Sequence, residues 1–204
     1  MTEELTAAGP HKPAETSVPV HPLIQRRWSP RALDPAGEVG PAQLRALLEA
    51  ARWAPSYGNT QPARYLVGRR GDETYQRIHD LLNRGNRSWA HAAAVLLLGV
   101  ALTRNEKGEL RYAAYGLGMA SQNLVLQAVA EGLVAHQMAG FDADAARTVF
   151  GLPEHAQPLV AIAVGTAGDP ATLDERYRDR ELSPRTRLSL GEIAFTGEWG
   201  EPAF

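Results

Sequence analysis

The spacing of apolar residues along the chain predicts a succession of helices and strands. From Pro41 to Trp53 the apolar residues recur at the helical period and form one face. This face consists of Leu44, Leu47, Leu48 and Ala51. Proline suits the first position of this helix, and Pro55 ends it because proline has no amide hydrogen and clashes with the preceding turn. A short strand is expected at 65–67, followed by a helix at 72–83 in which Asp72 is a good N-cap.

Longer apolar stretches predict the centre of the fold. The unbroken run at 92–102 is short enough for either class, but Gly99 and its branched residues favour a strand that is buried on both faces. Residues 158–164 form a second run of this kind. Residues 111–131 are apolar on most sides at helical spacing, so we expect a long helix in the centre of the molecule, with Gly132 just past its end.

The remaining segments are shorter or less periodic. Residues 1–18 are polar and predict a loose arm, and 21–27 can form a short helix. A strand is expected at 133–138 and a short helix at 142–151. The last stretch, 169–204, is rich in Arg, Glu and Pro and is poorly periodic. A tail of this length is easier to place around a partner subunit than inside a monomer.

This order of elements predicts a layered domain of helices and strands. The chain has 204 residues, of which 44% are hydrophobic, and this is enough for one sizeable core. We therefore expect a flexible arm at 1–18, one domain at 19–168, and a C-terminal extension of the same domain at 169–204.

Charge and composition exclude several classes of protein. The formal net charge of −2 provides no global field for nucleic acid or anionic lipid. The absence of cysteine excludes disulfides and thiolate chemistry, and it fits an intracellular chain. No apolar run approaches the roughly 20 residues of a membrane span. The start is acidic and lacks the pattern of a secretory signal, so we expect a cytoplasmic protein.

Two arginine pairs from distant parts of the chain are candidates for an anion site. One lies in the segment 27–31 (RWSPR) and the other in 184–187 (PRTR). Guanidinium groups suit a phosphate dianion, and the Ser29 hydroxyl can add a donor. From the residues alone, solvated surface arginines are the more common alternative.

A polar loop at 55–62 is the second candidate, because Ser, Asn and Gln offer donors and acceptors between two rigid elements. An ordinary polar turn is the alternative. The glycines at 116–118 lie inside a helical stretch and do not fit a dinucleotide-binding turn. The six histidines show no metal-binding spacing, and no serine stands in a G-x-S-x-G motif. His136 is best interpreted as a buried, hydrogen-bonded histidine near a pocket.

Taken together, these motifs resemble the nitroreductase family in their order and spacing over residues 20–195. The most specific parts are 27–31, the helix end and loop at 47–62 (LLEAARWAPSYGNTQP), Gly85-Asn86 before Trp89, Asn123-Leu124 with Ala128, Gly132-Leu133, Gly140-Phe141-Asp142, and Arg185 with Arg187. The resemblance implies an α+β fold with a central mixed β-sheet flanked by helices. It also implies an intertwined homodimer with FMN at the interface.

The resemblance further implies the positions that bind the cofactor. They are Arg27, Trp28, Ser29, Arg31, Pro55, Ser56, Tyr57, Asn59, Asn86, Gln137, Ala139, Gly140, Arg185 and Arg187. The two arginine pairs with Ser29 would hold the phosphate and ribityl chain, while Arg31 and Asn86 would face the pyrimidine edge of the flavin. Gly140 would offer its amide near flavin N5, with 137–139 beneath the ring. The loop at 55–59 would come from the other subunit.

By the same resemblance, the flavin carries the chemistry and no metal or dedicated catalytic side chain is needed. NADH or NADPH would give hydride to flavin N5, and a nitroaromatic or quinone would then accept it in ping-pong order. Many members carry a glutamate where this chain has Ala139, and a small polar residue where it has Tyr57. The alternative is a member that binds or senses flavin with little turnover; a cofactor-free structural dimer would require both arginine pairs to be incidental.

Overall fold

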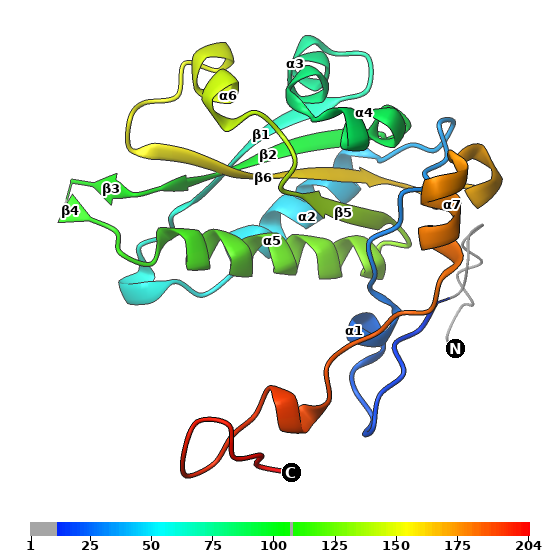
Figure 1. Cartoon of the computed structure of the whole chain (residues 1–204). Helices are drawn as coiled ribbons and strands as arrows, with labels where there is room; N and C mark the ends of the chain where they lie inside the picture. Colours follow the sequence, from blue (N-terminus) through cyan, green and yellow to red (C-terminus); the bar gives the residue numbers. More distant parts are fainter. Residues whose placement is uncertain (1–11, 107) are drawn as a thin grey trace.

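A four-stranded antiparallel sheet forms the middle layer of the fold, which is described from a computed structural model over residues 12–106 and 108–204 (Figure 1). The strand order is β1 (Ala63–Arg69), β2 (Val95–Leu102), β6 (Ala156–Gly165) and β5 (Val134–Met138). All three pairings are antiparallel. The expectation of a mixed sheet was therefore wrong, although the helices on both faces give the strands the burial that is common in parallel sheets.

The lower layer in Figure 1 consists of α2 (Pro41–Arg52) and α5 (Ala113–Ala130). The leucines of the predicted α2 face turn inward, and Leu47 is fully buried. Asn123 ties the two helices together by donating to the Ala50 carbonyl at 3.1 Å. The hydroxyls of Tyr65 and Ser121 meet at 3.1 Å and join α5 to β1. These contacts hold the start of the polar loop against the sheet.

The upper layer contains α3 (Glu73–Leu81), α4 (Arg84–Ala90) and α6 (Ala143–Val149). Asp72 caps α3 as predicted, through the amide of Tyr75. The helix α4 was not predicted, because its short, polar sequence buries only Trp89 and Ala90. The predicted strand at 92–102 begins at Val95, since residues 92–94 form the turn that follows α4.

Two segments from opposite parts of the sequence lie toward the end of α5 where its last turn is (Figure 1). There the short helix α1 (Pro22–Arg26) and α7 (Glu175–Leu182) flank the extended segment 27–31. The sequence of the segment 169–204 is poorly periodic and predicted no helix, but the segment contains α7. It also contains the short 3-10 helices η2 (Pro170–Thr172) and η3 (Leu190–Glu192). A small hairpin of β3 (Arg104–Asn105) and β4 (Gly108–Glu109) was also not predicted.

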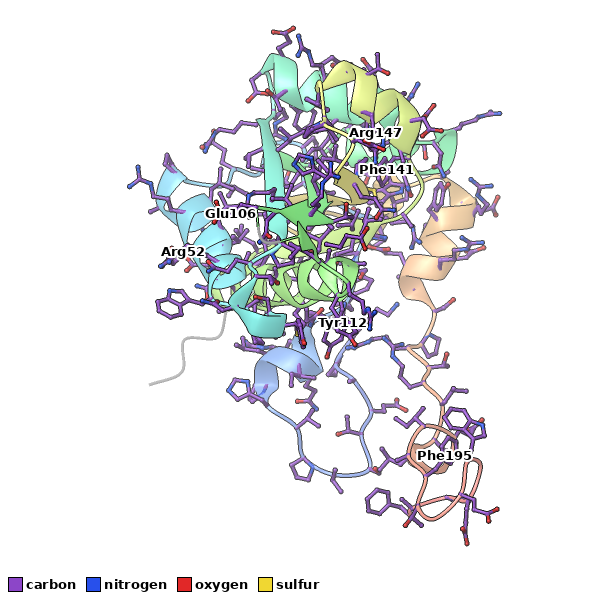
Figure 2. All side chains as sticks on the ribbon, turned by 90° about the vertical axis from the view of Figure 1, so that its left-hand side faces the viewer. Arg52, Glu106, Tyr112, Phe141, Arg147 and Phe195 are labelled. Carbon is purple, nitrogen blue, oxygen red and sulfur yellow. The ribbon has the colours of Figure 1, made fainter. Side chains whose placement is uncertain are left out.

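Beyond α7 the chain runs out from the body of the molecule (Figure 1), and Phe195 lies far from Phe141 and Arg147 of the body (Figure 2). The tail exposes several large apolar side chains. They are Leu188, Leu190, Ile193, Trp199 and Phe204. Such a set, on a segment with so few contacts to its own body, is typical of a surface that binds another protein.

The central helix α5 has one open side in the single chain. Leu117, Leu124 and Val125 are buried against the sheet, whereas Tyr112 and Tyr115 are exposed. A helix that is apolar on nearly all sides is usually covered on all sides. Within the described residues, no helix is both long and apolar enough to span a membrane.

Candidate functional site

Folding brings Arg27 close to the second arginine pair, although more than 150 residues separate them in the sequence. Arg27 donates to the Ser29 hydroxyl at 3.3 Å. Arg185 donates to the backbone carbonyls of Lys12 and Gln25 at 2.9 and 2.8 Å, which fixes the segment after α7 against α1. Arg187 is exposed and donates to its neighbour, the Thr186 carbonyl. The predicted phosphate-binding residues therefore lie in one region.

The charges in this region are uncompensated. Burial lowers the pKa of Arg27 from its usual value, and repulsion from Arg185 and Arg187 lowers it further. Burial and Arg187 lower the pKa of Arg185 in the same way. In the described part of the chain, no carboxylate forms an ion pair with any of these three arginines. The arrangement is suited to a multiply charged anion.

Arg31 continues this surface and is held by α7. Its backbone amide donates to the two Glu181 oxygens at 2.9 and 3.1 Å, and its guanidinium lies over the Tyr177 ring at 5.6 Å. Burial lowers the pKa of Arg31, while the Glu181 carboxylate acts in the opposite direction. Glu181 and Tyr177 were not predicted, because charged and aromatic residues in an arginine-rich tail give no signal of burial.

Asn86 and Gly140 meet on the neighbouring side of the region. The Asn86 side chain donates to the Gly140 carbonyl at 3.0 Å, and the Asn83 amide donates to the same oxygen at 3.0 Å. A Cβ atom on Gly140 would lie 2.8 Å from the Asn86 amide nitrogen, so a larger residue could not occupy this position without a shift. Gln137 is half-buried and Ala139 is exposed just before it.

His136 links these parts, and it is buried and hydrogen-bonded as expected. It lies on β5, and its Nδ1 donates to the Pro30 carbonyl at 2.9 Å. The imidazole packs 4.6 Å from the Trp89 ring of α4. The segment 27–31, α4 and β5 are thus joined through one side chain. Trp28, which was also a candidate, carries the Lys12 ammonium over its ring at 4.6 Å.

The other predicted residues lie elsewhere in the single chain. Pro55, Ser56, Tyr57 and Asn59 lie in and just before the 3-10 turn η1 (Tyr57–Asn59), at the end of α5 where its first turn is. The segments next to α1 and after α7, which carry the arginines, lie toward the other end of α5 (Figure 1). The Tyr57 ring is exposed and lies 5.0 Å from the Tyr112 ring. One chain therefore does not bring all the predicted residues together.

The loop around η1 has a constrained backbone. Gly58, Asn59 and Gln61 all have positive φ, and the Ser56 hydroxyl accepts from the Gln61 amide at 2.9 Å. Positive φ at two residues other than glycine carries strain, which is often found at functional loops. The loop thus holds the exposed Tyr57 in a defined place.

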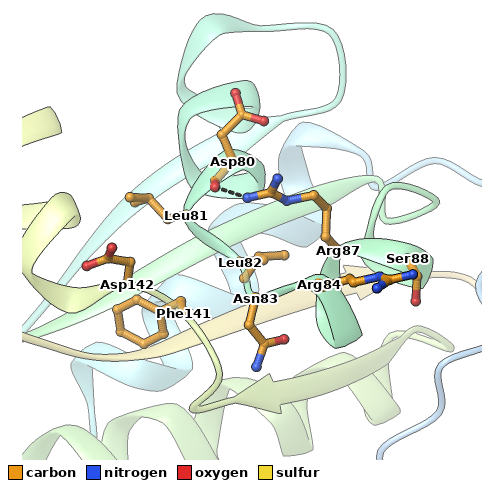
Figure 3. Close-up of a pocket in the computed structure, with 9 residues that line it drawn as sticks. All are labelled: Asp80, Leu81, Leu82, Asn83, Arg84, Arg87, Ser88, Phe141 and Asp142. Atoms are coloured by element: carbon orange, nitrogen blue, oxygen red, sulfur yellow. Dashed lines mark hydrogen bonds between the residues drawn. The ribbon is translucent and has the colours of Figure 1, made fainter.

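A groove of about 680 Å³ adjoins Gly140 on the outer side of the molecule (Figure 3). Its walls include Arg84, Arg87, Asp80 and Asp142, and the formal charges of these four side chains cancel. The guanidinium of Arg87 is also bonded to the Asp80 carbonyl. The groove therefore favours no anion, unlike the arginine region.

Comparison with known proteins identifies the family of this chain. The model of the nitroreductase family matches residues 24–88 and 73–166. The chain belongs to the nitroreductase family. The family expected from the motifs is thereby confirmed.

Individual relatives support this membership. An uncharacterized 15.4 kDa protein of Mycolicibacterium smegmatis is 44% identical over 147 residues, which cover 68% of this chain and 99% of that protein. A crystal structure of an oxidoreductase containing FMN is 31% identical, with a TM-score of 0.85 and 98% of both chains covered. A protein of Desulfovibrio desulfuricans, solved in complex with FMN, is 26% identical, with a TM-score of 0.68 and coverage of 90% of this chain and 99% of that chain.

The titration of His136 predicts how the stability of this nitroreductase-family protein depends on pH. Burial lowers the pKa of His136 from 6.5 to about 4. Between these values the unfolded chain binds a proton that the folded chain does not, so the free energy of unfolding should fall by about 1.4 kcal/mol per pH unit as the pH decreases, or about 3 kcal/mol in total. Above pH 6.5 this contribution is constant.

Urea unfolding between pH 4 and 7 measures this slope. His136→Gln should remove it, whereas His91→Gln, which alters an exposed histidine, should retain it. Equal slopes in the wild type and in His136→Gln would show that His136 is not the group responsible.

Proposed function

We propose that this protein is an FMN-dependent oxidoreductase that takes hydride from NADH or NADPH and passes it to an acceptor such as a nitroaromatic or a quinone in ping-pong order. The observation that carries the proposal is the group of three mutually repelling arginines with no carboxylate partner among the described residues. Relatives that contain FMN support the choice of cofactor. When bound, FMN supplies the redox chemistry.

The phosphate and ribityl chain would be held by Arg27, Ser29, Arg185 and Arg187, with Trp28 beside them. Arg185 is already fixed by two backbone carbonyls, so its guanidinium is preorganised. Arg27 and Arg187 retain donors that no described carboxylate occupies. A phosphate dianion would relieve the repulsion among the three cations.

The ring of the flavin would lie along the neighbouring surface. Arg31 and Asn86 would face its pyrimidine edge, where a cation stabilises negative charge on the reduced cofactor. Gly140 would present its backbone amide near N5, with Gln137 and Ala139 beneath the ring. The close packing of the Asn83 and Asn86 side chains against Gly140 supports this role, because a Cβ atom there would displace them.

A homodimer would complete the site. In one chain the loop with Pro55, Ser56, Tyr57 and Asn59 lies at the opposite end of α5 from the arginines. A second copy packed against the open side of α5 would bring its loop to the cofactor. The free edge of β1 supports this arrangement, since β1 has no second neighbour in the described sheet.

The apolar tail would bind the partner in the same dimer. A pocket of about 240 Å³ lies between α2, β1 and α5 and is lined mainly by apolar residues. The tail exposes a tryptophan, a phenylalanine and several aliphatic residues that need such cover. We therefore propose that the segment after Arg187 wraps the partner subunit.

The alternative is a family member that binds flavin with little turnover. Tyr57 is the feature that favours it, because its exposed ring could narrow the mouth of a partner's site. The sequence and fold leave both readings compatible with FMN, and a measurement of turnover separates them.

Anaerobic spectroscopy tests the enzymatic function. The purified protein, loaded with FMN, should lose its flavin absorbance when NADH or NADPH is added and recover it when a nitroaromatic or quinone follows. A flavin band that neither donor bleaches would establish the alternative reading. Failure to bind FMN at all would contradict both.

Arg27→Ala should weaken FMN binding by about tenfold to a hundredfold, because it removes one charge-assisted hydrogen bond worth about 1.5–3 kcal/mol. Titration of apoprotein with FMN, followed by flavin fluorescence, measures the change. Arg26→Ala is the matched control, since Arg26 is the exposed neighbour and its side chain bonds to the Pro22 carbonyl of its own helix. Equal affinities in the two variants would contradict the phosphate assignment.

Removal of residues 188–204 should weaken the dimer while leaving α7 and the arginines in place. The deleted segment has few contacts with its own body and carries the exposed apolar residues, so the monomer should remain folded. Analytical ultracentrifugation across concentrations measures the dissociation constant. A truncated chain with the dissociation constant of the wild type would contradict the wrapping tail.

A further inference from the structure

Helix α7 presents two buried side chains from the same face to the candidate site. Tyr177 is 6% exposed and Glu181 is 0% exposed, and they lie four residues apart, which places them one turn apart on one side of the helix. The rest of α7 is strongly polar. Burial of a glutamate is rare unless its charge is compensated, so these contacts require an explanation.

The Glu181 carboxylate binds the backbone of the segment that carries Arg31. It accepts from the Arg31 amide at 2.9 and 3.1 Å and from the Ala32 amide at 3.0 Å. The positive charges of Lys12 and Arg31 lie close enough to interact with it. Three amide hydrogen bonds and nearby cations offset the cost of burying the carboxylate. They also define where the Arg31 backbone lies.

Tyr177 contacts both sides of the site. Its hydroxyl donates to the Gly85 carbonyl at 2.9 Å, immediately before Asn86, and accepts from Arg176 at 2.6 Å. Its ring lies beneath the Arg31 guanidinium at a distance of 5.6 Å. A Cβ atom on Gly85 would lie 3.0 Å from the hydroxyl, so the glycine permits this approach. One tyrosine thus contacts Arg31 and the residue just before Asn86, and Arg31 and Asn86 are the two groups that would face the proposed pyrimidine edge.

We propose that Tyr177 and Glu181 are positioning residues that set Arg31 and Asn86 against the pyrimidine edge of the flavin. This inference rests on the proposed function, because it assumes that FMN binds with that edge toward these two residues. Glu181 fixes the Arg31 backbone, and Tyr177 fixes the Arg31 side chain and the start of α4. Both contacts come from α7, so the docking of this helix sets the distance between Arg31 and Asn86.

Whether Glu181→Gln weakens or tightens FMN binding separates a positioning role of Glu181 from a purely electrostatic one. Glu181→Gln keeps the shape of the side chain but removes its negative charge, and loss of that charge alone should tighten the binding of anionic FMN. A carboxamide, however, replaces one of the two acceptor oxygens with an NH₂ group, which cannot accept from the Arg31 amide that donates to both oxygens in the wild type. If Glu181 positions Arg31, the variant should bind FMN about tenfold more weakly, with a similar loss for riboflavin, which has no phosphate.

The experiment is a titration of FMN and riboflavin with wild type, Glu181→Gln, Arg31→Ala and the double variant. Because Glu181 contacts the Arg31 backbone, that contact survives in Arg31→Ala, and the effect of Glu181→Gln should then nearly vanish. Glu175→Gln is the matched control, since it makes the same change at an exposed position of α7 and should bind as the wild type does.

Tyr177→Phe provides a second, charge-neutral measurement if Glu181→Gln does not fold. It keeps the ring beneath Arg31 and removes the hydroxyl, which bonds to Gly85 and Arg176. Through the lost bond to Gly85 it should weaken binding in the wild type but not in Asn86→Ala. Unchanged or tighter FMN binding in Glu181→Gln, or an equal loss with and without the Arg31 side chain, would overturn the inference. Absence of FMN binding by the wild type would instead overturn the proposed function.

Discussion

Repulsion among the arginines at the junction of the two chain ends is the constraint on which the candidate site depends. The pKa values of Arg27 and Arg185 are lowered by partial burial and, in addition, by repulsion from the neighbouring arginines, including Arg187. Backbone carbonyls hold Arg185 in place and provide no negative charge in return. An anion that binds all three removes this cost, so ligand binding should also stabilise the junction of the chain ends.

The central sheet supports the arginine region through its strand β5. The inner strands β2 and β6 are almost wholly buried, and β5 extends from them to His136. His136 then connects the sheet to the segment 27–31 by donating to the Pro30 carbonyl. On the other side, Glu181 of α7 accepts from the amides of Arg31 and Ala32. Loops tied to a rigid sheet by such bonds combine precise placement with accessibility, which is a common arrangement of binding sites.

Apolar periodicity was sufficient to predict the elements that form the core. The helices α2 and α5 and the strands β2 and β6 each carry a long apolar pattern, which burial in the core requires. Strand direction could not be predicted in this way, since a strand covered on both faces shows the same run of apolar residues in either direction. The short helices α4 and α7 bury two residues each, too few to produce a period.

For the candidate site, the residues expected to bind the ligand could be predicted, but the residues that hold them in place could not. The arginines, Ser29, Asn86 and Gly140 could be named because they match a family pattern, and the geometry brings them into one region. Glu181 and Tyr177 match no such pattern, and their burial depends on the docking of α7, which is a tertiary contact. The residues that bind a ligand can thus be visible in a sequence while those that hold them in place are not.

The position of the loop at 55–59 has a consequence for the assembly. The loop is anchored to α5 through Gly116, where a Cβ atom would contact Pro62, so it cannot swing to the far end of the helix without breaking core packing. Its strained backbone is also fixed in one conformation. If the loop and the arginines act on one ligand, they must therefore come from different chains. The binding of that ligand would then depend on protein concentration, because a site divided between two subunits exists only in the dimer.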